Sequence, residues 1–290
     1  MDKKLRLQRI QNYISKMPSL PITVTKILEI SNDPKASPAD LNKVISLDPV
    51  LMGKVLKLIN SAYYGLNQEI TSLARAIIML GINTVKNLAL STAVLGSFGN
   101  PKHFQALNME GFWRHSLCVG VTAKLVAKYR KIPPKHLEEY FIAGVLHDIG
   151  KIPLNNKFEE EYVQAMGKSD IDHSPLYQAE KAVMDYNHME AGHLVLKSWR
   201  IGDDIMDTVL YHHTPSAYGG KHIDLVYTIA AANYYANITE IGFSGDRYPE
   251  KVSTEVFDYL NISLDFLDDI EDQVQQAIEK AQVFLNVASS

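Results

Sequence analysis

Residues 37–59 read SPADLNKVISLDPVLMGKVLKLI, and this stretch encodes two consecutive helices. Ser37 is suited to an N-cap, Pro38 to the first helical position and Asp40 to the third. Asp48 and Pro49 end this helix near residue 47, and Pro49 opens the next one. The second helix has an apolar face made of Val50, Leu51, Val55, Leu56 and Ile59. The stretch therefore predicts paired amphipathic helices.

Apolar residues keep helical spacing through nearly the whole chain, and alternating patterns bounded by turns are rare. The predicted fold class is all-α. We expect five or six short helices within residues 1–98, followed by helices at about 109–130, 135–149, 175–184, 187–199, 203–213 and 223–237. A long amphipathic helix is expected over residues 263–286, and its apolar stripe needs a partner surface on its own domain or on a second subunit. A homodimer through this helix is therefore one of the two possibilities.

Small residues, a turn former and a proline gather at residues 97–101, which read SFGNP. We place a domain border there. The predicted segments are a helical bundle at 1–98, a second helical unit at 99–240, and a C-terminal loop with the long amphipathic helix at 241–290.

Composition limits the function classes. The 290 residues are 46% hydrophobic, enough for a sizeable core, and the net charge of -4 with scattered basic residues makes nucleic-acid binding an unlikely role. The single cysteine, Cys118, has apolar neighbours and suits a reducing compartment. Charged residues through Arg9 replace the apolar run of a secretory signal, and no stretch has the length of a membrane span. We expect a cytoplasmic protein without membrane contact.

Histidines end the apolar stripes of four predicted helices. A lone histidine on such a face is most simply a core residue, but burying several ionisable groups is unfavourable unless they are paired or bind a cation. Neutral imidazole together with carboxylate is a common ligand set for Fe, Mn, Zn or Co. The pattern therefore favours one shared centre, to which these stripes contribute His115, His147 with Asp148, His188, and His212 with His213.

The motifs around these histidines resemble a known family. Residues 146–151 (LHDIGK), with 113–116 (WRHS) upstream, are similar to the HD superfamily of metal-dependent phosphohydrolases. Residues 211–215 (YHHTP) and the spacing of His188, Gly192 and Trp199 narrow the resemblance to the HDOD domain. In the first half, 20–21 (LP), 46–49 (SLDP) and 57–62 (KLINSA) resemble the helical region that precedes the HD-like core in that family. The resemblance covers about residues 15–237.

The resemblance implies an N-terminal helical bundle packed against an HD-like domain with a metal site. It implies one or two divalent ions, of Fe, Mn, Zn, Co or Ni, with Asp148 able to bridge two of them. Catalysis would fall to Asp148 and to Lys151, which could neutralise phosphate charge. The positions that match the family's metal ligands are His115, His147, Asp148, His188, His212 and His213, with Asn233 where the family has a last aspartate.

Three departures from the HD-GYP relatives change the expected function. Asn233 is neutral and a poorer ligand than aspartate, Gly111 stands where those enzymes have a glutamate, and residues 214–220 (TPSAYGG) lack the Gly-Tyr-Pro segment. We therefore expect a bacterial-type HDOD signal transduction protein that binds metal and a nucleotide or phosphate ligand and acts on a protein partner. The alternatives are an active phosphodiesterase on a nucleotide or cyclic dinucleotide, and a metal-free structural adaptor.

Overall fold

The computed structural model describes residues 3–17, 20–31, 36–98 and 106–289. Every regular element within these ranges is a helix, which confirms the all-α prediction. The first part of the chain forms α1 (Lys3–Ile14), α2 (Ile22–Ser31), α3 (Pro38–Ile45), α4 (Pro49–Ile59), α5 (Leu73–Leu80) and α6 (Ile82–Phe98).

The predicted helix starts, with Ser37 as N-cap and with Pro49 opening the second helix, are confirmed. The Ser37 side chain accepts a hydrogen bond from the Asp40 amide, and the Asp40 carboxylate accepts one from the Ser37 amide at 2.9 Å. The Asp48 carboxylate accepts from the Leu51 amide at 2.9 Å. These bonds satisfy amides that have no partner inside the helix. Local chemistry thus fixes where α3 and α4 begin.

The second part contains the six helices predicted between residues 109 and 237 and three that the sequence pattern did not predict, α9, α10 and α15. The sequence of α9, KIPLNNK, has a proline in its first turn, and its first five residues are buried, so no polar face marks it as a helix. The elements are α7 (Met109–Tyr129), α8 (Leu137–Leu146), α9 (Lys151–Lys157), α10 (Glu159–Asp172), α11 (Leu176–Met184), α12 (His188–Ser198), α13 (Asp203–Tyr211), α14 (Ile223–Ile238) and α15 (Thr254–Leu260), with single turns at Pro134–His136 and Pro215–Ala217.

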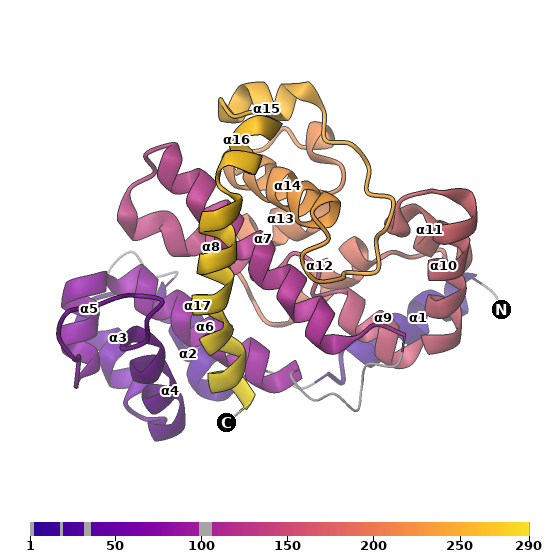
Figure 1. Ribbon diagram of the computed structural model, residues 1–290. Helices are drawn as coiled ribbons and strands as arrows, with labels where there is room; N and C mark the ends of the chain where they lie inside the picture. Colours follow the sequence, from indigo (N-terminus) through magenta and orange to yellow (C-terminus); the bar gives the residue numbers. More distant parts are fainter. Residues whose placement is uncertain (1–2, 18–19, 32–35, 99–105, 290) are drawn as a thin grey trace.

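The expected continuous helix over residues 263–286 is wrong. The chain forms α16 (Leu264–Asp269) and α17 (Glu271–Ser289), which are separated at Ile270. The break places Glu271 and Asp272 in the first turn of α17, where acidic side chains interact favourably with the helix dipole. The apolar stripe of α17 is buried by α7, α6 and α4 of the same chain, so this face is already covered (Figure 1).

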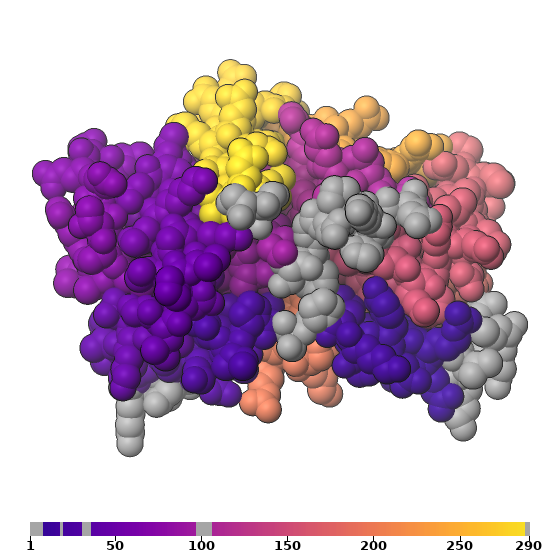
Figure 2. All heavy atoms as spheres, turned by 90° about the horizontal axis from the view of Figure 1, so that it is seen from below, coloured from indigo at the N-terminus to yellow at the C-terminus, as the bar shows by residue number. Residues whose placement is uncertain are grey.

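The first helix of the chain packs against the second part of the chain. Helix α1 packs on α9 and α12, away from the other N-terminal helices, and Figure 2 shows the indigo N-terminal residues as two separate patches. One hydrophobic cluster includes residues from all three predicted segments. The predicted border at residues 99–101 lies outside the described residues, and the division into domains stays a prediction.

Helix α7 is the central element. It packs against α8, α14 and α17, and its own middle is fully buried. Cys118 lies there, and burial raises the pKa of its thiol to about 12, in keeping with an unreactive core residue. Among the described residues no single helix combines the length and apolarity of a membrane span, and α5 with Ile82–Gly96 of α6 meets that test only as a pair bent by 119°.

Candidate metal centre

The predicted site residues come from six helices and their ends, and they meet in the core. His115 lies in the middle of α7, and Asn233 faces it from α14. The α8–α9 turn contributes His147 and Asp148, Lys151 opens α9, His188 opens α12, and His212 and His213 follow α13. His213 is partly exposed, whereas the other seven side chains are buried, each at 4% exposure or less.

Glycines allow these elements to approach closely enough to form the cluster. A Cβ atom on Gly150 would lie 1.9 Å from the His188 carbonyl oxygen and 2.4 Å from the Gly192 amide nitrogen. A Cβ on Gly144 would lie 2.6 Å from the Gly120 backbone, where α8 crosses α7. Any side chain at these positions would separate the helices. The glycines of the LHDIGK motif and of the α12 stripe therefore bring Asp148 and His188 together.

The Asp148 carboxylate is the centre of the cluster, and its Oδ1 atom faces α12 and α13. His188 Nε2 lies 3.3 Å and His212 Nε2 lies 3.6 Å from Oδ1. His188 Nε2 is also 3.4 Å from His212 Nε2 and 3.1 Å from His213 Nε2. Four donor atoms thus converge on one small volume, which we call the Oδ1 side.

The other oxygen, Oδ2, faces α7 and α9. The Lys151 ammonium donates to it at 2.7 Å, and His147 Nε2 lies at 3.2 Å. His115 Nε2 is further away, at 3.9 Å, and lies 3.1 Å from Asn233 Oδ1. We call this group the Oδ2 side.

Backbone carbonyls and one carboxylate orient three of the imidazoles. His147 Nδ1 donates to the Gly144 carbonyl at 2.7 Å, and His212 Nδ1 donates to the Val209 carbonyl at 2.9 Å. His188 Nδ1 donates to Glu180 at 2.7 Å, and the same carboxylate oxygen accepts from the His188 amide at 2.8 Å. With the proton on Nδ1, each Nε2 presents a lone pair to Asp148, as in histidine metal ligands.

The protonation states also suit metal binding. Burial lowers the pKa of His115 and of His212 to about 3, and it holds the pKa of His213 well below the usual value. Burial alone would raise the pKa of Asp148, but its interactions with His147 and Lys151 outweigh this effect and hold that pKa well below normal. At neutral pH His115, His212 and His213 are therefore neutral imidazoles and Asp148 is an ionised carboxylate, the forms that bind metals.

Two buried atoms at the centre have no hydrogen-bond partner among the described residues, Asp148 Oδ1 and His147 Nε2. Buried polar atoms are rarely left unpaired. A metal with bonds of about 2.1 Å to its ligands separates neighbouring donor atoms by about 3.0–3.4 Å. Three of the spacings on the Oδ1 side, 3.1, 3.3 and 3.4 Å, fall in this range, and the fourth is 3.6 Å. The residues present therefore fit a metal ion.

Two acidic residues of the site could not be recognised in the sequence. Glu180 on α11 is fully buried, and it reaches His188 because Asp185 reverses the chain between the two helices in a left-handed conformation. Asp246 is 4% exposed and accepts from the Leu176 amide at 3.2 Å. Burial raises its pKa, and the nearby Lys151 and His188 oppose that effect. An acid on an otherwise amphipathic helix or in a loop gives no sequence signal of burial.

Asp246 belongs to a segment, residues 242–253, which we call the strap. The strap begins against α7, where Phe243 donates to the Gly111 carbonyl at 2.9 Å and a Cβ on Gly242 would lie 2.3 Å from the His115 amide nitrogen. Further on, Arg247 pairs with Asp170 of α10 at 2.8 Å. A Cβ on Gly111 would lie 3.5 Å from Phe243, an ordinary contact, so the close packing of the strap depends on Gly242 rather than on Gly111.

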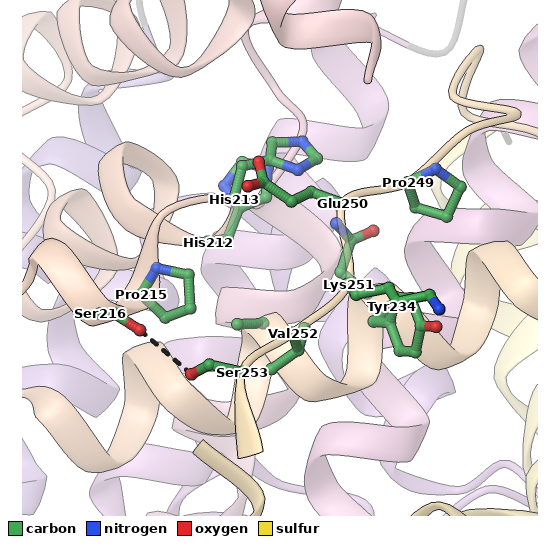
Figure 3. Close-up of a pocket in the computed structure, with 12 residues that line it drawn as sticks. His212, His213, Pro215, Ser216, Tyr234, Pro249, Glu250, Lys251, Val252 and Ser253 are labelled. Atoms are coloured by element: carbon green, nitrogen blue, oxygen red, sulfur yellow. Dashed lines mark hydrogen bonds between the residues drawn. The ribbon is translucent and has the colours of Figure 1, made fainter. Parts of the chain in front are cut away.

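A cavity of about 140 Å³ lies between the strap, α14 and the turn after α13. His212, His213 and Asn233 line it on the side of the metal cluster. Figure 3 shows His212, His213 and Glu250 close together, and a hydrogen bond of 3.1 Å between Ser216 and Ser253 joins the turn to the strap. One side of the metal cluster therefore borders this small polar cavity.

Comparison with known proteins defines the family. The model of the HDOD domain matches residues 17–215, and the chain belongs to this family. It is similar to an HDOD domain protein of unknown function from Geobacter sulfurreducens, with a TM-score of 0.74 and 25% identity over 96% of this chain and 99% of that one. A candidate phosphohydrolase from Shewanella amazonensis SB2B has a TM-score of 0.68 and 21% identity, covering 98% of this chain and 96% of that one.

Similarity also extends to a candidate signal transduction protein from Marinobacter aquaeolei VT8, with a TM-score of 0.75 and 18% identity over 99% of this chain and 66% of that one. A curated relative, an uncharacterised protein of Treponema pallidum (strain Nichols), is 23% identical over 255 residues. These residues are 87% of this chain but 48% of the relative, so the chain spans about half the length of that protein.

Proposed function

We propose that this protein is a regulatory HDOD protein of a signal transduction pathway, and that its core binds a divalent metal ion and, beside it, an anion of about the size of phosphate. The observation that carries the proposal is the convergence of His188, His212 and His213 with Asp148 Oδ1 at the spacing of metal ligands. When bound, the ion would supply a positive charge that can hold an anion in the adjoining cavity.

The balance of buried charge supports a cation. Among the described residues, the charged side chains buried in and around the cluster are Asp148, Glu180, Asp246 and Lys151. When all are ionised, three negative charges face one positive charge. The remaining two negative charges equal the charge of one divalent ion, and without it their burial is unfavourable.

The cavity determines which ligand fits beside the ion. Its volume, about 140 Å³, is smaller than the about 300–1,000 Å³ that sites for drug-sized ligands occupy. Lys251 brings a positive charge to the cavity and Glu250 a negative one, and Ser216 and Ser253 bring hydroxyl groups. These groups suit a phosphate-sized anion. Hydrolysis of a nucleotide or cyclic dinucleotide would require the strap to move away first.

Two observations support the signalling role. The Marinobacter relative carries that role in its name, and the first bundle exposes large apolar side chains that suit a protein partner. Ile22 on α2 is 77% exposed, and Ile78 on α5 is 81% exposed. Leu47 and Val50, on either side of the turn between α3 and α4, are similarly exposed.

Elemental analysis tests the proposal. Protein purified without a histidine tag or chelators should contain close to one equivalent of Fe, Mn, Zn, Co or Ni, and His188→Ala should lose it. His136→Ala is the matched control, because His136 is partly exposed and pairs with Glu139 outside the cluster. Less than about a tenth of an equivalent in the wild type, even after incubation with these metals, would refute metal binding.

A further inference from the structure

We propose that the centre holds a single metal ion, on the Oδ1 side of Asp148, and that a hydrogen-bonded chain through Asn237, Asn233 and His115 together with Lys151 closes the Oδ2 side to a second ion. This inference rests on the proposed metal-binding function. It assigns to His115 and Asn233 a role other than the ligand role that the family resemblance implies, and it names Asn237 as a positioning residue.

The orientation of the Asn237 amide follows from its partners. Its Nδ2 atom lies 3.0 Å from the Asn233 backbone carbonyl oxygen, which can only accept a hydrogen bond. The atom must therefore be the amide nitrogen. The other end agrees, because Asn237 Oδ1 accepts from the Ser244 hydroxyl of the strap at 3.1 Å.

The Asn237 amide fixes the Asn233 amide in turn. Asn237 Nδ2 also lies 3.0 Å from the Asn233 side-chain atom that faces His115. Since Nδ2 is a donor, that atom must be an acceptor, which identifies it as Oδ1. The same Oδ1 lies 3.1 Å from His115 Nε2. His115 must therefore donate through Nε2–H.

This tautomer distinguishes His115 from the oriented histidines of the cluster. His147, His188 and His212 carry their hydrogen on Nδ1 and present a lone pair from Nε2 toward Asp148. His115 Nε2, the atom that lies 3.9 Å from Asp148 Oδ2, carries a hydrogen instead. A nitrogen that holds a proton has no lone pair for a metal, so the Oδ2 side lacks one of its expected ligands.

Lys151 closes the same side electrostatically. Its ammonium lies 2.7 Å from Asp148 Oδ2 and is almost completely buried, at 1% exposure. A second ion would have to bind this oxygen next to a fixed positive charge, with little solvent to screen the repulsion. On the Oδ1 side the carboxylate oxygen has no hydrogen-bond partner among the described residues. One carboxylate thus offers one oxygen to a lysine and the other to a metal.

The number of bound ions and the His115 tautomer test the inference together. We expect wild-type protein saturated with Zn²⁺ to retain one equivalent after removal of loosely bound metal. In a long-range ¹H–¹⁵N spectrum, His115 should be the Nε2–H tautomer, and His188 and His212 should be Nδ1–H. The double variant Asn233→Asp/Lys151→Gln should gain a second equivalent, because it supplies a carboxylate and removes the competing cation.

Asn156→Asp/Lys157→Gln is the matched control, since it makes the same chemical changes near the end of α9, and it should keep one equivalent. Two equivalents in the wild type, or His115 in the Nδ1–H form, would overturn the inference while leaving metal binding intact. No bound metal would overturn the proposed function as well. The wild-type stoichiometry and tautomer decide the question even where the double variant does not fold.

Discussion

Glu180→Gln is expected to weaken metal binding by about tenfold or more without unfolding the protein. The Glu180 carboxylate accepts two hydrogen bonds from His188, at 2.7 Å from Nδ1 and 2.8 Å from the amide. A hydrogen bond to a charged group contributes about 1.5–3 kcal/mol and one between neutral groups about 0.5–1.5 kcal/mol. Replacing the carboxylate by a neutral amide therefore weakens the Nδ1 hydrogen bond, which holds His188 in its metal-binding tautomer, by about 1–1.5 kcal/mol. This loss corresponds to close to a tenfold lower metal affinity.

Competition with a chromophoric chelator measures this effect, and urea unfolding of the metal-free protein checks the fold. Glu160→Gln is the matched control, because Glu160 is exposed in the first turn of α10. Partners of metal-bound histidines typically change affinity by about 10–100-fold when they are replaced. An affinity within threefold of the wild type would mean that His188 is not oriented by Glu180 for metal binding.

Three further outcomes follow from the same geometry. Gly242→Ala should lower the free energy of unfolding in urea by about 1–3 kcal/mol, because position 242 has a φ of 77° and a Cβ there would meet the His115 amide. Gly219→Ala has open space around it and should change that free energy by less than about 0.5 kcal/mol, so equal effects of the two variants would contradict the close contact. Below pH 6.5 the unfolded metal-free chain binds protons at His115 and His212, whereas the folded chain, in which both pKa values are about 3, does not. The free energy of unfolding should therefore decrease as the pH is lowered, by up to about 1.4 kcal/mol per pH unit for each histidine. Stability that is constant from pH 7 to 5 would show that these imidazoles are not buried in neutral form. Metal at about a hundred times its dissociation constant should raise the free energy of unfolding by about 2.7 kcal/mol, an effect that calorimetry detects as a higher Tm and that His188→Ala should abolish; a His188→Ala variant that is stabilised equally would place the metal elsewhere.

The elements that could be predicted from the sequence are those with a local capping signal at one end or with a clear apolar stripe. Ser37, Asp48 and Pro49 define helix starts through local hydrogen bonds and a fixed φ, independent of the rest of the fold. Helix α9 was missed because its first five residues, polar Lys151 and Asn155 among them, are all buried, so no contrast between a polar and an apolar face marks it as an amphipathic helix. The break at Ile270 was missed because the apolar spacing continues through it.

The candidate site was partly visible for a similar reason. Histidines on apolar stripes indicated a common centre, and the structure brings all eight predicted positions together around Asp148. Glu180, Asp246 and Asn237 were not visible, since their roles depend on contacts between elements that no local pattern encodes. The different surroundings of Asp148 Oδ1 and Oδ2 likewise follow only from the three-dimensional structure.

Anomalous X-ray scattering at the metal absorption edge, from crystals of metal-loaded protein, locates each bound ion relative to Asp148. We expect one peak per chain, about 2.0–2.3 Å from Asp148 Oδ1 and from the Nε2 atoms of His188, His212 and His213. We also expect no peak between His115 and Asp148 Oδ2. A peak on the Oδ2 side, or no peak at the cluster at all, would contradict this expectation.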